Sequence, residues 1–103
     1  MQHEKPHLNP DLTLGELADR VGLSTHHLSQ LLNGEIGKNF FDFVNEYRIN
    51  EMKEKLTDSA CAHLKIEELA FSSGFNSKSV YSTAFKKMTG TTPSQFRKMP
   101  SQG

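Results

Sequence analysis

The chain has 103 residues, enough for one domain with a modest core, because only 35% of its residues are hydrophobic and none is Trp. Its one cysteine, Cys61, excludes a disulfide framework within the chain, which is typical of a reducing cytosol. No apolar run approaches the roughly 20 residues of a membrane helix, and residues 1–6 lack the apolar segment of a signal peptide. We therefore expect a cytoplasmic location, although a longer protein could be tethered to a membrane through a region outside this chain.

The net charge of zero conceals an uneven distribution along the chain. Residues 1–60 carry 6 Lys or Arg against 10 Asp or Glu, a balance of −4, whereas residues 61–103 carry 6 against 2, a balance of +4. A polyanion would be attracted to the second part. Charge alone does not decide the matter, because ordinary solvated surface explains the asymmetry equally well.

The chain contains an internal repeat with a period of about fifty residues. Matched positions are 52 apart before the turn of each copy and 53 apart after it, so the second copy has one extra residue near Asn76. The matched pairs are small, apolar or turn-forming: Leu14/Ile66, Leu17/Leu69, Ala18/Ala70, Gly22/Gly74, Leu23/Phe75, Ser24/Ser77, Leu28/Tyr81, Leu32/Phe85, Gly37/Gly90 and Phe43/Phe96. The polar positions between them differ, as expected for copies that share a backbone but not a ligand surface.

The first copy, residues 1–38, is predicted to form a helix-turn-helix unit. Its first helix begins at the capping box of Thr13 and Glu16. Gly22 supplies the left-handed conformation of the turn, and Ser24 is placed to cap the second helix. The positions predicted to face inward are Leu14, Leu17, Ala18, Val21, Leu28, Leu31 and Leu32.

A long linker helix is predicted over residues 39–57, after Gly34 and Gly37 end the first unit. Its apolar positions have helical spacing: Phe40, Phe43, Val44, Tyr47, Met52 and Leu56. At 1.5 Å per residue, such a helix is about 26 Å long.

The second copy, residues 58–99, is predicted to form a second helix-turn-helix unit, followed by a tail over residues 100–103. Gly74 forms its turn, Ser77 is placed to cap the next helix, and residues 92–95 have the Thr-Pro-Ser-Gln pattern that opens a further helix. The positions predicted to face inward are Ile66, Leu69, Ala70, Tyr81, Ala84, Phe85, Met88 and Phe96. Since nothing alternates with a period of two, the predicted fold class is all-α, without strands.

This architecture is typical of proteins that read DNA, because a helix-turn-helix unit lays its second helix in the major groove. Small residues at Ala18 and Ala70 let the two helices of each unit cross closely. A rigid linker of about 26 Å can hold two such units near the ~34 Å spacing of successive major grooves, with some bending of the DNA.

Residues 66–97 resemble the signature of the AraC/XylS family of bacterial transcription regulators, and the resemblance extends over roughly residues 8–98. The motifs that carry it are Gly74-Phe75, Ser77-x-Ser79, Phe85-Lys86-Lys87, Gly90-x-Thr92-Pro93, Phe96-Arg97 and, in the linker, Phe43-x-Asn45-x-Tyr47-Arg48. The resemblance implies a homeodomain-like domain of about seven helices that regulates transcription by binding a double-stranded DNA operator.

The resemblance also implies which residues contact DNA. The base-reading positions would be Thr25, His26, Ser29, Gln30, Lys78, Ser79, Ser82 and Thr83. The phosphate contacts would be Lys86, Lys87, Arg97 and Lys98. Their chemistry is suitable, because Gln can bond adenine bidentately, Lys can donate to guanine, and basic side chains contact phosphates.

Two departures from the family pattern affect these expectations. Thr83 stands where the family often has Arg, which removes one strong contact. Only residues 2–7 precede the first capping box, so the leading helix of the family domain is expected to be truncated or absent. Members of the family generally carry a sensing or dimerising region before this domain, and we expect that region to be missing from this chain.

Other kinds of site have little support in the sequence. The adjacent His26 and His27 point to different sides of a helix, and the pair Cys61 and His63 lacks two further ligands at finger-like spacing. We predict no metal, no cofactor and no enzymatic activity. One alternative to DNA binding stays open, namely a protein-interaction module that docks on RNA polymerase or on the missing N-terminal region; steep salt dependence of DNA binding would distinguish the two.

Overall fold

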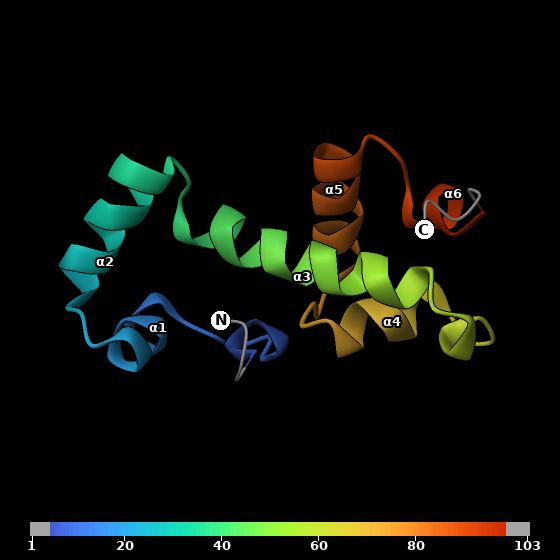
Figure 1. The fold of residues 1–103 in the computed structure, drawn as a ribbon, viewed down its shortest axis with the longest axis horizontal. Helices are drawn as coiled ribbons and strands as arrows, with labels where there is room; N and C mark the ends of the chain where they lie inside the picture. Colours follow the sequence, from blue (N-terminus) through green and yellow to red (C-terminus); the bar gives the residue numbers. More distant parts are fainter. Residues whose placement is uncertain (1–4, 99–103) are drawn as a thin grey trace.

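The computed structural model describes residues 5–98, which form helices joined by short turns (Figure 1). The α-helices are α1 (Leu14–Val21), α2 (Thr25–Leu31), α3 (Phe40–Leu56), α4 (Ile66–Ser72), α5 (Lys78–Thr89) and α6 (Pro93–Lys98). Shorter turns are the 3-10 turns η1 (Pro6–Leu8) and η3 (Ser59–Cys61) and the π-helical turn η2 (Leu32–Ile36). No strand occurs within this range, which confirms the predicted all-α class. The predicted tail over residues 100–103 lies outside the described residues.

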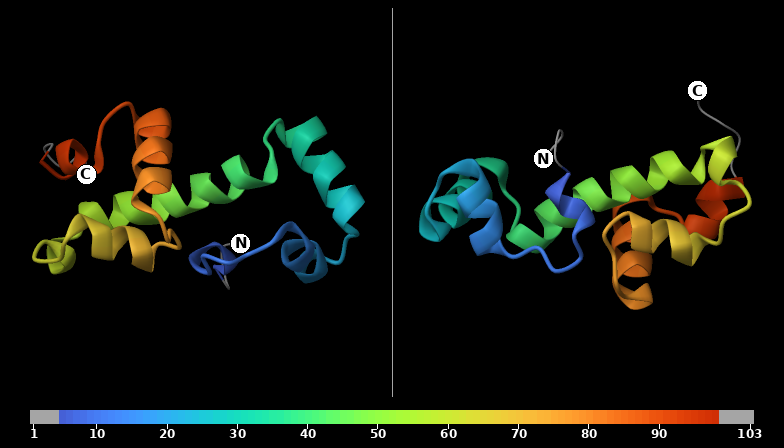
Figure 2. Two further views of the ribbon diagram at one scale, coloured as in Figure 1. Left: turned by 180° about the vertical axis from the view of Figure 1, so that it is seen from behind. Right: turned by 90° about the horizontal axis from the view of Figure 1, so that it is seen from below.

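The helix α3 runs along the long axis of the molecule, whose principal extents are 42 × 27 × 23 Å (Figure 1). The helices α2 and α5 both stand across the direction of α3, with α2 beyond its N-terminal end and α5 against its middle (Figures 1 and 2). The helices α4 and α6 pack on the C-terminal half of α3 (Figure 2). The second helix of each helix-turn-helix unit, α2 or α5, thus stands across the direction of one shared linker helix, α3.

Side-chain caps define where several helices begin. The hydroxyl of Thr13 accepts the backbone N–H of Glu16 at 3.1 Å and donates to the Glu16 carboxylate at 3.1 Å. The hydroxyl of Ser24 caps α2 by accepting the backbone N–H three residues later at 3.1 Å. At α6 the box is reciprocal, because Thr92 accepts the N–H of Gln95 at 3.1 Å while Gln95 accepts the N–H of Thr92 at 3.0 Å. These three starts confirm the sequence predictions.

Two local predictions are wrong. Ser77 precedes α5, but its hydroxyl makes no capping bond; it lies 3.2 Å from the hydroxyl of Ser79. Gly34 does not end the second helix, because the chain continues through it as η2 and turns only at Gly37, where φ is +76°. The hydroxyl of Ser77 thus bonds a neighbouring side chain in place of the backbone of α5, and Gly37 forms the turn that was expected at Gly34.

Residues 5–98 contain two separate core clusters, one at each end of α3. The first contains Leu17, Ala18, Leu28 and Leu32, with Leu14, Phe40 and Phe43 packed against it. The second contains Ile49, Met52, Leu56, Leu69, Ala70, Phe75, Tyr81, Ala84 and Phe85. Since α3 supplies residues to both clusters, it connects two small cores that are each built around one helix pair.

The first cluster is thinner than the sequence pattern predicted. Val21 and Leu31 were expected to face inward, but both are exposed. The helices α1 and α2 are only two turns long, and each buries a narrow stripe around Leu17 and Leu28. The apolar spacing of a helix predicts which of its residues share one face. It does not predict whether the neighbouring helix is wide enough to cover Val21 and Leu31 at the edges of that face.

Candidate nucleic-acid interface

The helix α2 presents its predicted base-reading positions outward. Thr25, His26 and Gln30 are exposed, and Ser29 is half-buried. Leu28 points into the first core cluster and holds the helix on the molecule. The outward positions are thus set by burial of the opposite side, which is how a helix is oriented for reading a groove.

The predicted reading positions on α5 divide between two sides of that helix. Ser79 and Thr83 line a groove between α5 and the first half of α3, whereas Lys78 and Ser82 line a hollow beside α4 and α6. Residues four positions apart lie on the same stripe of a helix, so each pair shares one side. The two pairs therefore occupy adjacent stripes of α5, each beside a different neighbouring element.

The first of these hollows, which we call the α3–α5 groove, also contains residues that the sequence reasoning missed. It is lined by Asp42 and Asn45 from α3 and by Ser79, Val80, Thr83 and Lys87 from α5. Val80 is 43% exposed although it is apolar. Val80 lies between Ser79 and Thr83 in the sequence, but no sequence pattern connects α5 with residues some forty positions earlier.

The lysines predicted to contact phosphates are accessible. Lys86, Lys87 and Lys98 are all exposed. The ammonium of Lys87 lies 3.9 Å from a carboxylate oxygen of Asp42 across the α3–α5 groove. Lys87 is therefore partly engaged within the protein, which the sequence did not predict.

Arg97 has a different environment from the one predicted. Its Nη2 donates to the backbone carbonyls of Cys61 at 3.1 Å and Leu64 at 2.6 Å, and the side chain is half-buried. These bonds attach α6 to the loop before α4. These contacts give Arg97 a structural role, and the phosphate contact expected of it stays a prediction.

A short N-terminal segment, residues 5–9, packs against the turn of the second unit. The side chain of Arg48, on α3, donates to the carbonyls of His7 and Asn9, each at 2.8 Å. A Cβ placed on Gly74 would lie 2.1 Å from the His7 carbonyl oxygen. Gly74 is thus required both by its φ of +105° and by this close approach.

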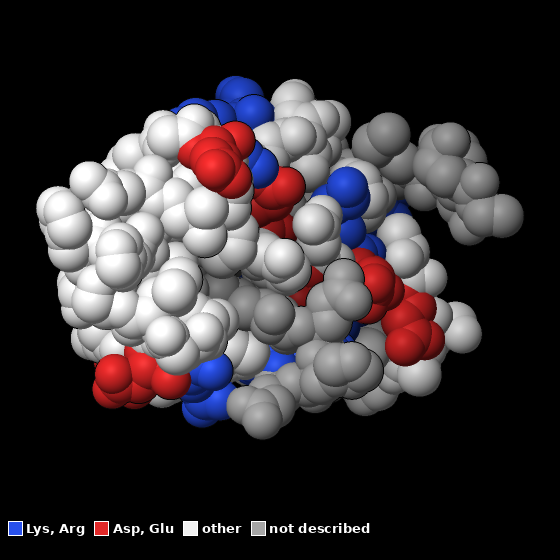
Figure 3. Space-filling model, turned by 60° about the vertical axis from the view of Figure 1, so that its left-hand side comes forward, with Lys and Arg blue, Asp and Glu red and all other residues white. Residues whose placement is uncertain are grey.

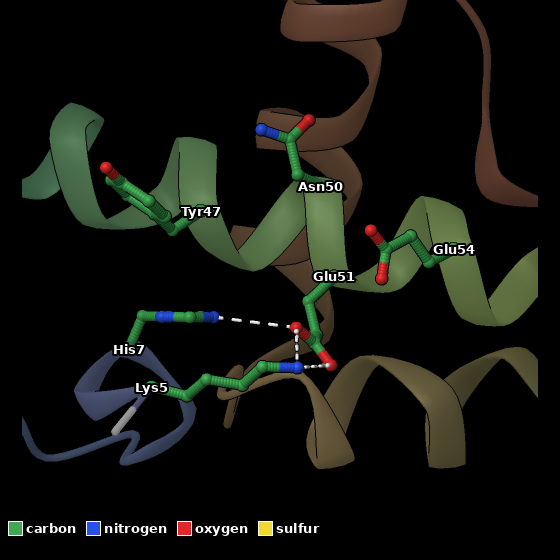
Figure 4. Close-up of a pocket in the computed structure, with 6 residues that line it drawn as sticks. All are labelled: Lys5, His7, Tyr47, Asn50, Glu51 and Glu54. Atoms are coloured by element: carbon green, nitrogen blue, oxygen red, sulfur yellow. Dashed lines mark hydrogen bonds and ion pairs between the residues drawn. The ribbon is translucent and has the colours of Figure 1, made fainter. Parts of the chain in front are cut away.

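The side chain of His7 lies in a small pocket with Lys5 and Glu51 (Figure 4). Its Nε2 is 3.7 Å from the Glu51 carboxylate, to which Lys5 donates at 3.2 Å. Burial lowers the pKa of His7 below its ordinary value of 6.5 and outweighs the opposing attraction of Glu51. Burial of Glu51 would raise its pKa, but the nearby cations, Lys5 foremost, lower it overall.

The surface around α2 differs in charge from the rest of the molecule. Figure 3 shows a broad area without Lys, Arg, Asp or Glu on this side. No charged residue occurs from position 21 to position 34. The exposed face of α2 therefore offers hydrogen-bonding and apolar groups without fixed charge.

Comparison with known proteins identifies the family. A family model described as a helix-turn-helix domain matches residues 17–99. The C-terminal domain of AraT, a response regulator from Geobacillus stearothermophilus, superposes with a TM-score of 0.77 at 32% identity, over 96% of this chain and 81% of that one. The chain belongs to the AraC-type helix-turn-helix family. This confirms the resemblance drawn from residues 66–97.

The curated relatives that the chain matches are much longer than the chain itself. It is 36% identical over 91 residues to an uncharacterized HTH-type transcriptional regulator of Staphylococcus aureus (strain COL). The aligned region covers 88% of this chain and 12% of that protein. It is 32% identical over 97 residues to the HTH-type regulator YfiF of Bacillus subtilis, covering 94% and 30%. The chain is thus similar to a minor part of each relative.

The described chain has a short element before α1. In place of a full leading helix, the described chain has the single 3-10 turn η1, attached through Arg48 to α3.

Within residues 5–98, no helix has both the length and the apolar character needed to cross a membrane. In the same range, no three His, Cys, Asp or Glu side chains are grouped so that they could hold a metal ion.

Proposed function

We propose that this AraC-type domain binds a double-stranded DNA operator by placing α2 and α5 in successive major grooves. The observation that carries the proposal is the arrangement of these helices, which both stand across the direction of α3 with polar positions outward (Figure 1). Each helix is held by its own core cluster, so each can be presented as a rigid unit. The family membership supports a role in regulating transcription.

The proposed base-reading residues of α2 are Thr25, His26, Ser29 and Gln30. Those of α5 are Lys78, Ser79, Ser82 and Thr83. The exposed lysines Lys86, Lys87 and Lys98 would neutralise phosphates, since ammonium groups supply the salt-dependent part of DNA affinity. All four proposed readers of α5 lie in its first two turns, which suits a recognition helix whose N-terminal residues contact base edges.

The experiment that tests this function is selection of bound sequences from a random DNA library, followed by titration of the selected DNA at several salt concentrations. We expect an enriched motif with two half-sites about 10 base pairs apart and an affinity that falls steeply with salt. A library with no enriched motif at low salt would contradict sequence-specific binding. That result would favour the alternative of docking on RNA polymerase or on a region N-terminal to this domain.

A further inference from the structure

A carboxylate lies among the residues proposed to contact DNA. Asp42 is on α3, but its side chain lines the α3–α5 groove together with Ser79 and Thr83. Its Oδ2 lies 3.9 Å from the Nζ of Lys87, and the two side chains are 43% and 69% exposed. Among the described residues that line this groove, Asp42 is the one anionic group.

The position of Asp42 in α3 has a structural explanation that is only partial. An acidic residue in the first turn of a helix interacts favourably with the helix dipole. The capping function, however, belongs to Asn39, whose side chain accepts the backbone N–H of Asp42 at 2.8 Å. The carboxylate of Asp42 is therefore not needed as a cap, and it extends instead to the lysine on α5.

We propose that Asp42 limits the affinity of this domain for DNA by holding Lys87 in an ion pair and by repelling the phosphates that approach the α3–α5 groove. The proposal rests on the proposed function, because it needs DNA at this face. When DNA binds, Lys87 must exchange the carboxylate for a phosphate, and the uncompensated charge of Asp42 then lies beside the polyanion. Both effects oppose binding, and both weaken as salt screens the charges.

Neutralising this carboxylate should therefore strengthen DNA binding. For Asp42→Asn we expect an affinity about two- to fivefold higher at low salt, the range that an exposed ion pair supplies. Freeing Lys87 also steepens the dependence of log affinity on log salt by up to about 0.9, the value of one phosphate contact. The gain should be similar on the selected operator and on unrelated DNA, because phosphates are common to both.

The chain provides a matched control on the same helix. Glu46 is an exposed carboxylate, 44% accessible, that forms an ion pair with Lys38. It lies beside a different hollow, with Phe43 and Tyr47, and not in the α3–α5 groove. Glu46→Gln removes the same charge as Asp42→Asn, so it measures what a change in net charge does by itself.

The experiment measures binding of the wild type, Asp42→Asn, Glu46→Gln, Lys87→Ala and the double variant Asp42→Asn/Lys87→Ala to one DNA over a range of salt. We expect a clear gain for Asp42→Asn, a smaller change for Glu46→Gln, and a reduced effect of Asp42→Asn when Lys87 is absent. Circular dichroism confirms that each variant is folded, since Asp42→Asn also removes a favourable helix-dipole interaction.

Three results would overturn the proposal. Unchanged or weaker DNA binding by folded Asp42→Asn contradicts it while leaving the proposed function in place. Equal gains from Asp42→Asn and Glu46→Gln reduce the effect to net charge. Failure of the wild type to bind any DNA rejects the proposed function first, and the role of Asp42 with it.

Discussion

At the scale of single residues, Gly74 is where the N-terminal segment, residues 5–9, packs closely against the turn of the second unit. A Cβ at this position would lie 2.1 Å from the backbone oxygen of His7 and 2.8 Å from the Nε of Arg48. Gly74→Ala must therefore displace the N-terminal segment, in addition to straining a residue at φ +105°. We expect the free energy of unfolding to fall by at least about 1–3 kcal/mol, measured by urea denaturation.

Gly34→Ala is the matched control. Gly34 lies within η2 and has no positive φ, and a Cβ added to it would meet no neighbouring atom within 4 Å. We expect this change to be neutral or stabilising, because alanine restricts the unfolded chain more than glycine does. Equal losses in the two variants would contradict the importance of the contact between Gly74 and His7.

His7 makes stability depend on pH, and the direction follows from its environment. Burial lowers its pKa in the folded protein below 6.5, so the unfolded chain binds the proton more readily. The stabilising effect of the neutral imidazole is present above about pH 6.5 and is lost as pH falls through the lower, folded pKa. The free energy of unfolding should therefore decrease between pH 7.5 and pH 5.5 in urea titrations.

His7→Gln tests this assignment, since it removes the proton-binding group but keeps a polar side chain. The variant should lose most of the slope between those two pH values. Glu51 does not mask the effect, because its pKa lies below 4.5 and its contribution is lost only at lower pH. His63→Gln, at an exposed position, serves as the control. If His7→Gln keeps the slope of the wild type, another group is responsible.

At the scale of elements, one side chain ties α6 to the loop before α4. Arg97 reaches the carbonyls of Cys61 and Leu64 across more than thirty positions of sequence. Arg97→Ala should lower the free energy of unfolding by about 1–3 kcal/mol, because it removes charge-assisted bonds from a half-buried site. Lys98→Ala, one residue later and exposed, should leave unfolding almost unchanged. A large loss of DNA affinity without loss of stability in Arg97→Ala would instead support a phosphate contact.

The elements show which features a sequence can predict. The starts of α1, α2 and α6 depend on contacts three residues apart, so the patterns at Thr13, Ser24 and Thr92 predicted them. The exposure of Val21 and the contacts of Arg97 depend on what lies opposite in space, which no local pattern records. For the same reason the all-α class was predictable, whereas the depth of the first core cluster was not.

The candidate site also has features that the sequence could predict and features that it could not. The candidate readers of α2 came from the family resemblance, and they face outward because Leu28 fixes the buried side of the helix. The α3–α5 groove was not predictable, since it brings Asp42 and Asn45 beside residues of α5 through packing between elements distant in sequence. Which side of α5 each reader faces likewise depends on where α3 and α4 pack.

At the scale of the whole molecule, the two helix-turn-helix units differ in the kinds of interaction that they can make with DNA. Positions 21–34, which include α2, carry no charged residue, and Figure 3 shows the corresponding broad uncharged surface. The C-terminal unit has the exposed lysines Lys86 and Lys98. If both units bind DNA, the second supplies the ionic part of the affinity, and the first acts mainly through hydrogen bonds and apolar contacts.

This division predicts opposite signatures for two single substitutions. Gln30→Ala should cost about 1–3 kcal/mol of discrimination at one base position and leave the salt slope unchanged, because an uncharged side chain releases no counterion. Lys86→Ala should weaken binding to all sequences alike and reduce the slope of log affinity against log salt by about 0.9. Titration of the selected DNA and of an unrelated duplex at three salt concentrations measures both quantities. A reduced salt slope in Gln30→Ala, or a base-specific effect in Lys86→Ala, would show that the two units share these roles.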